Sequence, residues 1–167
     1  MNNSSKFGKN IATIHPGEYY VSSKDEYIQT LLGSCVAVCF YDSVKQVSGM
    51  NHFMLAGNVS MSGFSAEVTA KHGMQSTMLL LEDMYKFGCT KKNIIAKVFG
   101  GGKVLPYENP VHNVPGDNIR VAKVVLEMED IVIDQTELGG NFTRKLIMDV
   151  KTGKVFLKKS VNYNLEE

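Results

Sequence analysis

YIQTLLGSCVAVCFY, residues 27–41, is the stretch of sequence that decides the fold. Residues 27–32 are apolar and β-branched enough to form a strand, and residues 35–41 are apolar throughout, as is typical of a buried strand. Gly33 and Ser34 interrupt the pattern between the two strands. A polar turn follows, and we expect residues 47–55 to return beside residues 35–41 as the second strand of a hairpin.

Working outward from this hairpin, the chain contains more strands than helices. We expect further strands at residues 17–21, 93–99, 131–134, 144–150 and 154–158, and helices at 67–87 and from 118 to about 128. Gly88 is placed to end the first helix, and Asp117 to cap the second. Strands with two helices and no regular strand–helix alternation predict the α+β class.

Length and composition restrict the classes of function. A chain of 167 residues fits one domain, which we expect over residues 13–167 behind a flexible tail of residues 1–12. The net charge of +1 and the absence of a lysine or arginine block argue against a nucleic-acid-binding protein. No apolar run approaches the length of a membrane span, and residues 1–10 lack the apolar core of a signal peptide, so we expect neither a membrane segment nor secretion. Three cysteines are an odd and low number, so a reducing cytoplasmic location is predicted.

Cys35 and His52 are the candidate chemical pair. If the hairpin loop is residues 42–45, Tyr41 pairs with Gln46 and Cys35 lies directly opposite His52. Cβ atoms of such cross-strand neighbours are roughly 4.5–5.5 Å apart, close enough for a thiol and an imidazole to share a hydrogen bond. A register shifted by two residues would leave the pair diagonal, but still on one face of the sheet.

Such a pair is what nucleophilic catalysis by cysteine requires. A free thiol, with a pKa of about 8.5, is mostly protonated at neutral pH, and a neighbouring imidazole can accept its proton. Backbone N–H groups at the chain break of Gly33 and Ser34 could then face the oxyanion of an amide intermediate.

Two other interpretations remain open at this point. A cysteine within an apolar strand is more often an inert core residue, which is our prediction for Cys39 and Cys89. A metal site made of Cys35, Cys39 and His52 is disfavoured, because four residues of strand span roughly 13 Å. We therefore predict no metal site.

The remaining motifs suggest no chemistry. The glycine run 100–102 before Lys103 lacks the spacing of a phosphate-binding loop and predicts a tight turn. His15, His72 and His112 have no partners at diagnostic spacing and are expected on the surface.

At this point the chain resembles a known family, CheD, the chemoreceptor glutamine deamidases of bacterial chemotaxis. The matching segments are LGSCVAVC at 32–39, HFML at 52–55, AKVFGG at 96–101, GDN at 116–118, and the pair of glycines at 139–140 followed by Arg144. The sequence departs from the family pattern at Ala56, where proline is frequent, and at Gly102, where alanine is frequent.

The resemblance implies a fold and a set of site residues. It implies a layered α/β/β/α sandwich with mixed sheets, similar to the catalytic domains of deamidating toxins. It also implies that Cys35 is the nucleophile, that His52 is the base, and that a nearby threonine orients His52. Thr30 is the preferred candidate, since a bulge at Gly33 would bring it to the Cys35 face, and Gln29 is the alternative.

The resemblance further implies an activity and partners. The expected activity is hydrolysis of glutamine side chains on the cytoplasmic helices of chemoreceptors, giving glutamate and ammonia without a cofactor. A CheC-like phosphatase is a further possible partner. The alternatives are a non-catalytic adaptor that binds receptors or such a phosphatase, and a cysteine peptidase.

Overall fold

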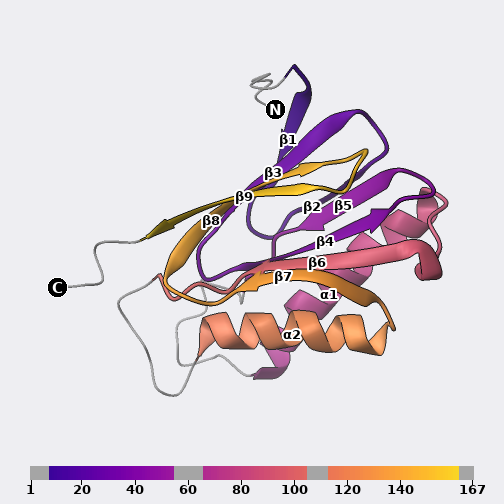
Figure 1. The fold of residues 1–167 in the computed structure, drawn as a ribbon. Helices are drawn as coiled ribbons and strands as arrows, with labels where there is room; N and C mark the ends of the chain where they lie inside the picture. The colour runs from indigo at the N-terminus through magenta and orange to yellow at the C-terminus, as the bar shows by residue number, and fades with distance from the viewer. Residues whose placement is uncertain (1–7, 55–65, 105–112, 162–167) are drawn as a thin grey trace.

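The computed structural model describes residues 8–54, 66–104 and 113–161, which form two β-sheets and two long helices (Figure 1). The strands are β1 (Asn10–Thr13), β2 (Tyr19–Ser22), β3 (Glu26–Leu32), β4 (Val36–Asp42), β5 (Val47–Asn51), β6 (Ile94–Gly100), β7 (Val132–Leu138), β8 (Phe142–Asp149) and β9 (Val155–Val161). The helices are α1 (Ala66–Lys86) and α2 (Val114–Met128), and a single 3-10 turn, η2, spans Lys91–Asn93. No helix in these segments is long and apolar enough to cross a membrane.

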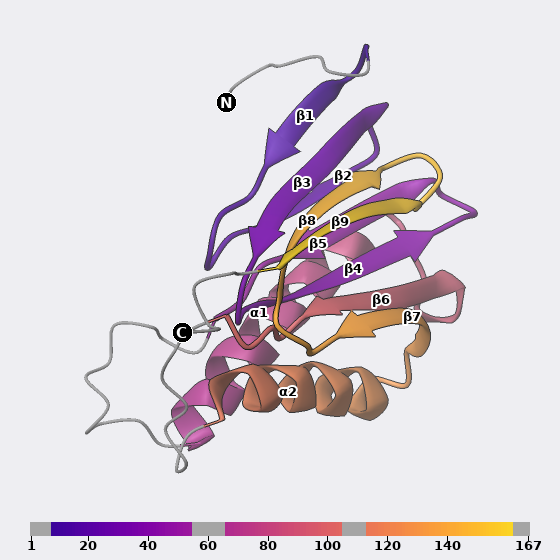
Figure 2. The same ribbon diagram turned by 60° about the vertical axis from the view of Figure 1, so that its left-hand side comes forward.

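The two sheets are stacked, and both are mixed. The four-stranded sheet has the order β1-β3-β8-β9, with β1 and β3 parallel. The five-stranded sheet has the order β2-β5-β4-β6-β7, with β6 and β7 parallel. Figure 2 shows α1 and α2 side by side beneath the five-stranded sheet, with the four-stranded sheet above it. The chain passes from one sheet to the other between β3 and β4, at residues 33–35.

Strand β4 carries both layers of the core, because its side chains alternate between the two faces of the sheet. Val36, Val38 and Phe40 pack against the helices, whereas Ala37 and Cys39 face the other sheet. All five are at most 1% exposed. This explains why the strand is apolar at every position in the sequence.

The predicted α+β class with mixed sheets in layers is confirmed. In the described residues both helices contact the five-stranded sheet, so the layers run β/β/α. The outer face of the four-stranded sheet has exposed side chains such as Leu31 and Phe156. A second helical layer, as in an α/β/β/α order, has no counterpart in residues 8–54, 66–104 and 113–161.

Two predicted boundaries need correction. Residues 10–12 are not part of a tail, since they lie in β1, where Ile11 is buried beside β3. Helix α2 begins at Val114 rather than after Asp117, because Asn113 caps it by accepting a hydrogen bond from the N–H of Gly116. Asp117 lies inside the first turn instead.

The hairpin register also differs from the predicted one. Asp42 pairs with Val47 and Cys39 with Met50, so the loop is residues 43–46 and not 42–45. The Asp42 carboxylate accepts hydrogen bonds from the N–H groups of Val44 and Lys45 across the turn. Asp42 therefore stays in the strand as its last paired residue, and every pairing moves by two positions.

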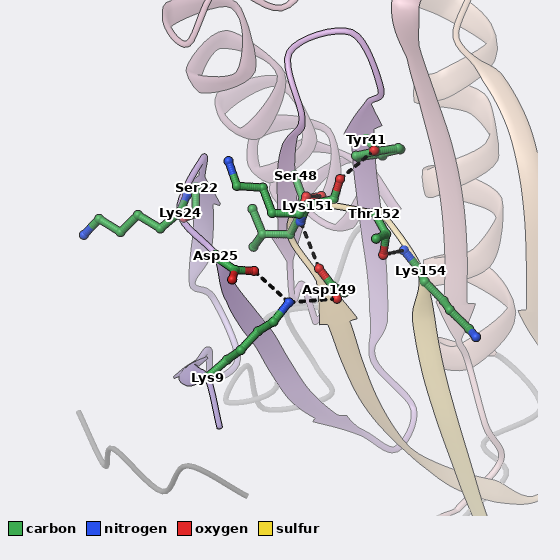
Figure 3. A network of polar contacts seen from close by, with 11 residues as sticks. Lys9, Ser22, Lys24, Asp25, Tyr41, Ser48, Asp149, Lys151, Thr152 and Lys154 are labelled. Atoms are coloured by element: carbon green, nitrogen blue, oxygen red, sulfur yellow. Dashed lines mark hydrogen bonds and ion pairs between the residues drawn. The ribbon is translucent and has the colours of Figure 1, made fainter. Parts of the chain in front are cut away.

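At one end of the sandwich the turn between β8 and β9 is hydrogen-bonded to the five-stranded sheet (Figure 3). The hydroxyl of Tyr41 donates to the carbonyl of Lys151 at 2.7 Å, and that of Ser48 donates to the carbonyl of Val150 at 2.7 Å. Asp149 holds the turn itself by accepting from the N–H of Lys151. These contacts fix the two sheets at the end of β4 that is remote from Cys35.

Candidate active site

His52 is a buried histidine whose ring is held by the opposite sheet. It follows β5 in the five-stranded sheet and is 2% exposed. Its Nδ1 lies 2.7 Å from the hydroxyl of Thr30, which belongs to β3 of the four-stranded sheet. That hydroxyl donates its one proton to the carbonyl of Ile14 at 2.9 Å. Thr30 must therefore accept from Nδ1–H, which leaves the lone pair of His52 on Nε2.

The Nε2 atom of His52 is buried and has no hydrogen-bond partner among the described residues. Burial, with a smaller effect from His15, lowers the pKa of His52 to about 4. The imidazole is therefore neutral near pH 7. A neutral ring with one fixed N–H and one free lone pair is the form that a general base requires.

Cys35 lies on the same face of the five-stranded sheet as His52. The bridge between Val36 and Phe53 continues the hairpin register, which puts Cys35 opposite Met54 and His52 opposite Ala37. Cys35 and His52 are therefore diagonal neighbours and not a direct pair. This is the consequence of the two-position shift, and it accounts for the lack of a hydrogen bond between thiol and Nε2 in this structure.

The thiol of Cys35 is protonated in this state. Burial raises the pKa of Cys35 to about 11, while the residue's own backbone N–H has the smaller, opposite effect. The side chain packs in the layer between the two sheets. The resting pair is thus a neutral thiol and a neutral imidazole, and a proton has to move from sulfur to nitrogen when the thiol attacks.

The three peptide carbonyls around Cys35 are all hydrogen-bonded. Gly102 N–H donates to Gly33 at 3.0 Å, and Gly101 N–H donates to Cys35 at 2.8 Å. The side-chain amide of Asn118, on α2, donates to Ser34 at 3.0 Å. The segment that carries the candidate nucleophile is therefore fixed from two sides.

The glycine run at the end of β6 makes this close approach possible. Gly100 has a φ of +117°, and a Cβ there would overlap the carbonyl oxygen of Cys35. Glycine is required where the backbone is both left-handed and this crowded. The run was predicted to be a tight turn, and it lies against the candidate nucleophile.

Thr30 reaches His52, and Gln29 does not. Gln29 points to the opposite face of β3, where its amide donates to Thr13 at 2.8 Å. The expected bulge at Gly33 was the wrong reason for choosing Thr30. Thr30 and Cys35 lie in different sheets, and the crossing between the sheets brings both to the inner layer.

The other candidates lie away from this site. Cys39 and Cys89 are free, buried cysteines in the core, and burial raises the pKa of Cys39 to about 12. His15 and His72 are exposed, as predicted, and His112 lies outside the described residues. Among residues 8–54, 66–104 and 113–161, no group of three or more His, Cys, Asp or Glu is arranged to hold a metal ion.

Two contributors were not assigned to the site from the sequence. Asn118 was noted only within the GDN segment, and the carbonyl of Ile14 carries no side-chain signal at all. A buried asparagine in an amphipathic helix is unusual enough to have marked Asn118. The role of Ile14 depends on the fold alone.

The chain is similar to known proteins of one family. Residues 54–159 match the family model described as CheD chemotactic sensory transduction. A protein of Janthinobacterium sp. (strain Marseille), named "Probable chemoreceptor glutamine deamidase CheD", is 39% identical over 92% of this chain and 75% of its own length. A protein of the same name from Sulfurimonas denitrificans is 36% identical over 87% of this chain and 91% of its own length.

Among solved structures, the hypothetical protein YfiH of Bacillus licheniformis aligns with a TM-score of 0.44 at 16% identity. The alignment covers 73% of this chain and 49% of that one.

Proposed function

The chain belongs to the CheD family, and from this premise we propose that it is a chemoreceptor glutamine deamidase with Cys35 as nucleophile and His52 as general base. The observation that carries the proposal is the state of His52. Its Nδ1 is bound to Thr30 and its Nε2 is free, on the face that it shares with Cys35. Its relatives are named for the same activity.

In the first step the sulfur of Cys35 attacks the side-chain amide carbon of a glutamine, and His52 Nε2 accepts the thiol proton. Because the two residues are diagonal neighbours, their side chains must close the remaining gap when substrate binds. Catalytic hydrogen bonds are often long in free enzymes and shorten in the substrate complex. The tetrahedral oxyanion is stabilised by backbone N–H groups of the segment that carries Cys35.

In the second step the imidazolium returns its proton to the leaving nitrogen, ammonia departs, and a thioester remains on Cys35. Water, deprotonated by His52, then attacks the thioester carbon. The carbon–sulfur bond breaks, the thiol regains its proton, and the product is glutamate. This series of reaction steps needs no redox partner and no metal ion.

The proposed substrates are glutamines on the cytoplasmic helices of chemoreceptors, and the proposed site of action is therefore the cytoplasm. Each reaction replaces a neutral amide with a negative carboxylate on a receptor helix. A new like-charge pair at helical spacing is unfavourable, which would alter receptor helix packing. The second proposed partner is a CheC-like phosphatase, which would bind the protein and modulate its activity.

The test is to incubate the protein with purified receptor cytoplasmic fragments, and then to measure ammonia release and map the modified glutamines by peptide mass spectrometry. The wild type should convert particular glutamines to glutamate, and Cys35→Ala should convert none. Cys39→Ala is the matched control, because Cys39 is a second buried cysteine in the same inner layer, within β4, and carries no proposed role. Binding without conversion would favour a non-catalytic adaptor, and backbone cleavage would favour a peptidase.

A further inference from the structure

A side-chain hydrogen bond from Asn118 holds the carbonyl of Ser34, in the segment of residues 33–35 that carries the candidate nucleophile. The carbonyls of Gly33 and Cys35 are held by backbone N–H groups of the glycine run. The carbonyl of Ser34 is held by the Nδ2 atom of Asn118, at 3.0 Å. The orientation of the Ser34–Cys35 peptide therefore depends on one side chain that can be substituted.

The direction of this peptide has a chemical consequence. The peptide bond is trans and planar, so the C=O of Ser34 and the N–H of Cys35 point in opposite directions. The C=O points toward Asn118 in the helical layer below the five-stranded sheet. The N–H of Cys35 is thus directed to the other side, where the Cys35 thiol and His52 lie.

The N–H of Cys35 is available for a ligand. No hydrogen bond from it is present in the described part of the chain. It belongs to the same residue as the attacking sulfur, and as a donor it lowers the pKa of the thiol against the larger effect of burial. An N–H beside the attacking sulfur is well placed to receive the oxygen of the attacked carbonyl.

We propose that Asn118 is a positioning residue that aims the N–H of Cys35 at the oxyanion, acting only through the carbonyl of Ser34. This inference rests on the proposed deamidase function. Asn118 touches neither substrate nor the reacting sulfur in this scheme. Its role is to keep one peptide from rotating while charge develops on the substrate oxygen.

The oxygen atom of the Asn118 side chain indicates that the residue has more than a structural role. Asn118 is 0% exposed, and its Oδ1 atom has no hydrogen-bond partner in the described residues. A buried, unpaired acceptor costs more than one neutral hydrogen bond typically contributes. This cost opposes the contribution of the hydrogen bond to Ser34, so the net effect of the amide on stability is small.

This small net effect provides the test. Asn118→Leu keeps the volume and removes both the unpaired Oδ1 atom and the hydrogen bond to Ser34. These two effects on stability oppose each other, so Tm should change little. The kcat for ammonia release should fall roughly ten- to hundredfold, with KM almost unchanged, since an oxyanion contact acts only in the transition state. Alkylation of Cys35 by iodoacetamide should keep its wild-type rate, because that displacement develops no oxyanion.

Two further proteins separate the possible causes of a fall in kcat. Asn113→Ala removes the cap of the same helix without touching Ser34, so it should lower stability while leaving kcat near wild type. His52→Ala should slow both alkylation and ammonia release. An unchanged kcat in Asn118→Leu, or a fall that Asn113→Ala reproduces, would overturn the role of Asn118. If wild-type protein released no ammonia, the deamidase proposal would fail first, and this inference with it.

Discussion

A single threonine hydroxyl decides how His52 can act. Thr30 has one proton, which it donates to Ile14, so it can only accept from the imidazole. The tautomer of His52 is therefore set by a backbone carbonyl two bonds away in the hydrogen-bond chain. The hydroxyl orients the base without carrying any charge of its own.

Thr30→Val keeps the shape of this side chain and removes the hydrogen bond. A neutral hydrogen bond contributes about 0.5–1.5 kcal/mol, so kcat should fall by up to roughly tenfold with little change in KM. Alkylation of Cys35 should slow in parallel, because the defect lies in the base. Gln29→Leu, on the opposite face, is the matched control and should leave both rates unchanged. A large loss in Gln29→Leu with normal turnover in Thr30→Val would reverse the assignment.

The pH dependence follows from the two shifted groups. His52 is a competent base only when neutral, which holds above its pKa of about 4, and the Cys35 thiol keeps its proton up to about pH 11. The rate kcat/KM should therefore be flat through neutral pH and should fall on the acid side near pH 4, far below the usual imidazole range. Circular dichroism at each pH would exclude unfolding. A fall in kcat/KM near pH 6.5 instead would mean that burial does not lower the pKa of His52.

At this scale the sequence identified the proposed partners but not their geometry. Cys35, His52 and Thr30 could be named from motif and residue type. The diagonal relation of Cys35 and His52 could not, because it depends on the turn, where the Asp42 side chain keeps Asp42 in the strand. Asn118 was missed because its partner is a carbonyl 84 residues away in the chain.

Among the elements, the end of β6 sets how closely a neighbouring strand can approach the nucleophile. Gly100→Ala would place a methyl group onto the carbonyl oxygen of Cys35 and would force a left-handed backbone on alanine. We expect a loss of stability of about 1–3 kcal/mol and a large fall in kcat. Urea denaturation and ammonia release would measure the two effects.

Gly139→Ala separates backbone strain from crowding. Gly139 also has a positive φ, of +76°, but no atom lies within 4 Å of a Cβ placed there. This variant should lose some stability and keep most of its activity. If both alanine variants behaved alike, crowding at Cys35 would not be the cause.

The elements were largely predictable, and their ends were not. Alternation and apolar content identify β3, β4, β6 and β8, because these strands are buried on one or both faces. Strand β1 is a short edge strand that pairs with β3, so residues 10–12 carry no local pattern that would distinguish them from a tail. The predicted start of α2 is four residues too late, because Asn113 and Asp117 are both residue types that can cap a helix.

In the molecule as a whole, the sheets are joined at both ends of the sandwich, and only one end carries the site. Ser48→Ala removes a hydrogen bond between the sheets at the remote end. It should lower the free energy of unfolding by about 1 kcal/mol and leave kcat unchanged. Thr143→Val, which removes an exposed hydrogen bond within the four-stranded sheet, should cost less. A fall in kcat in Ser48→Ala would show that the two ends are coupled.

The order of the layers was the feature least accessible from sequence. Which faces of two apolar sheets meet is decided by long-range pairing, such as β3 with β8, and no local pattern encodes it. The resemblance supplied the idea of a sandwich, but not the position of both helices on one side.

The hydrogen bond between Thr30 and His52 spans the gap between the two sheets. The turnover rate would then depend on the distance between the two sheets. A molecule that binds the open face of the four-stranded sheet, or a cavity made in the inner layer, could tilt the imidazole without reaching the thiol. Hydrostatic pressure, which compresses voids between layers, offers a direct way to change that spacing and to follow the rate.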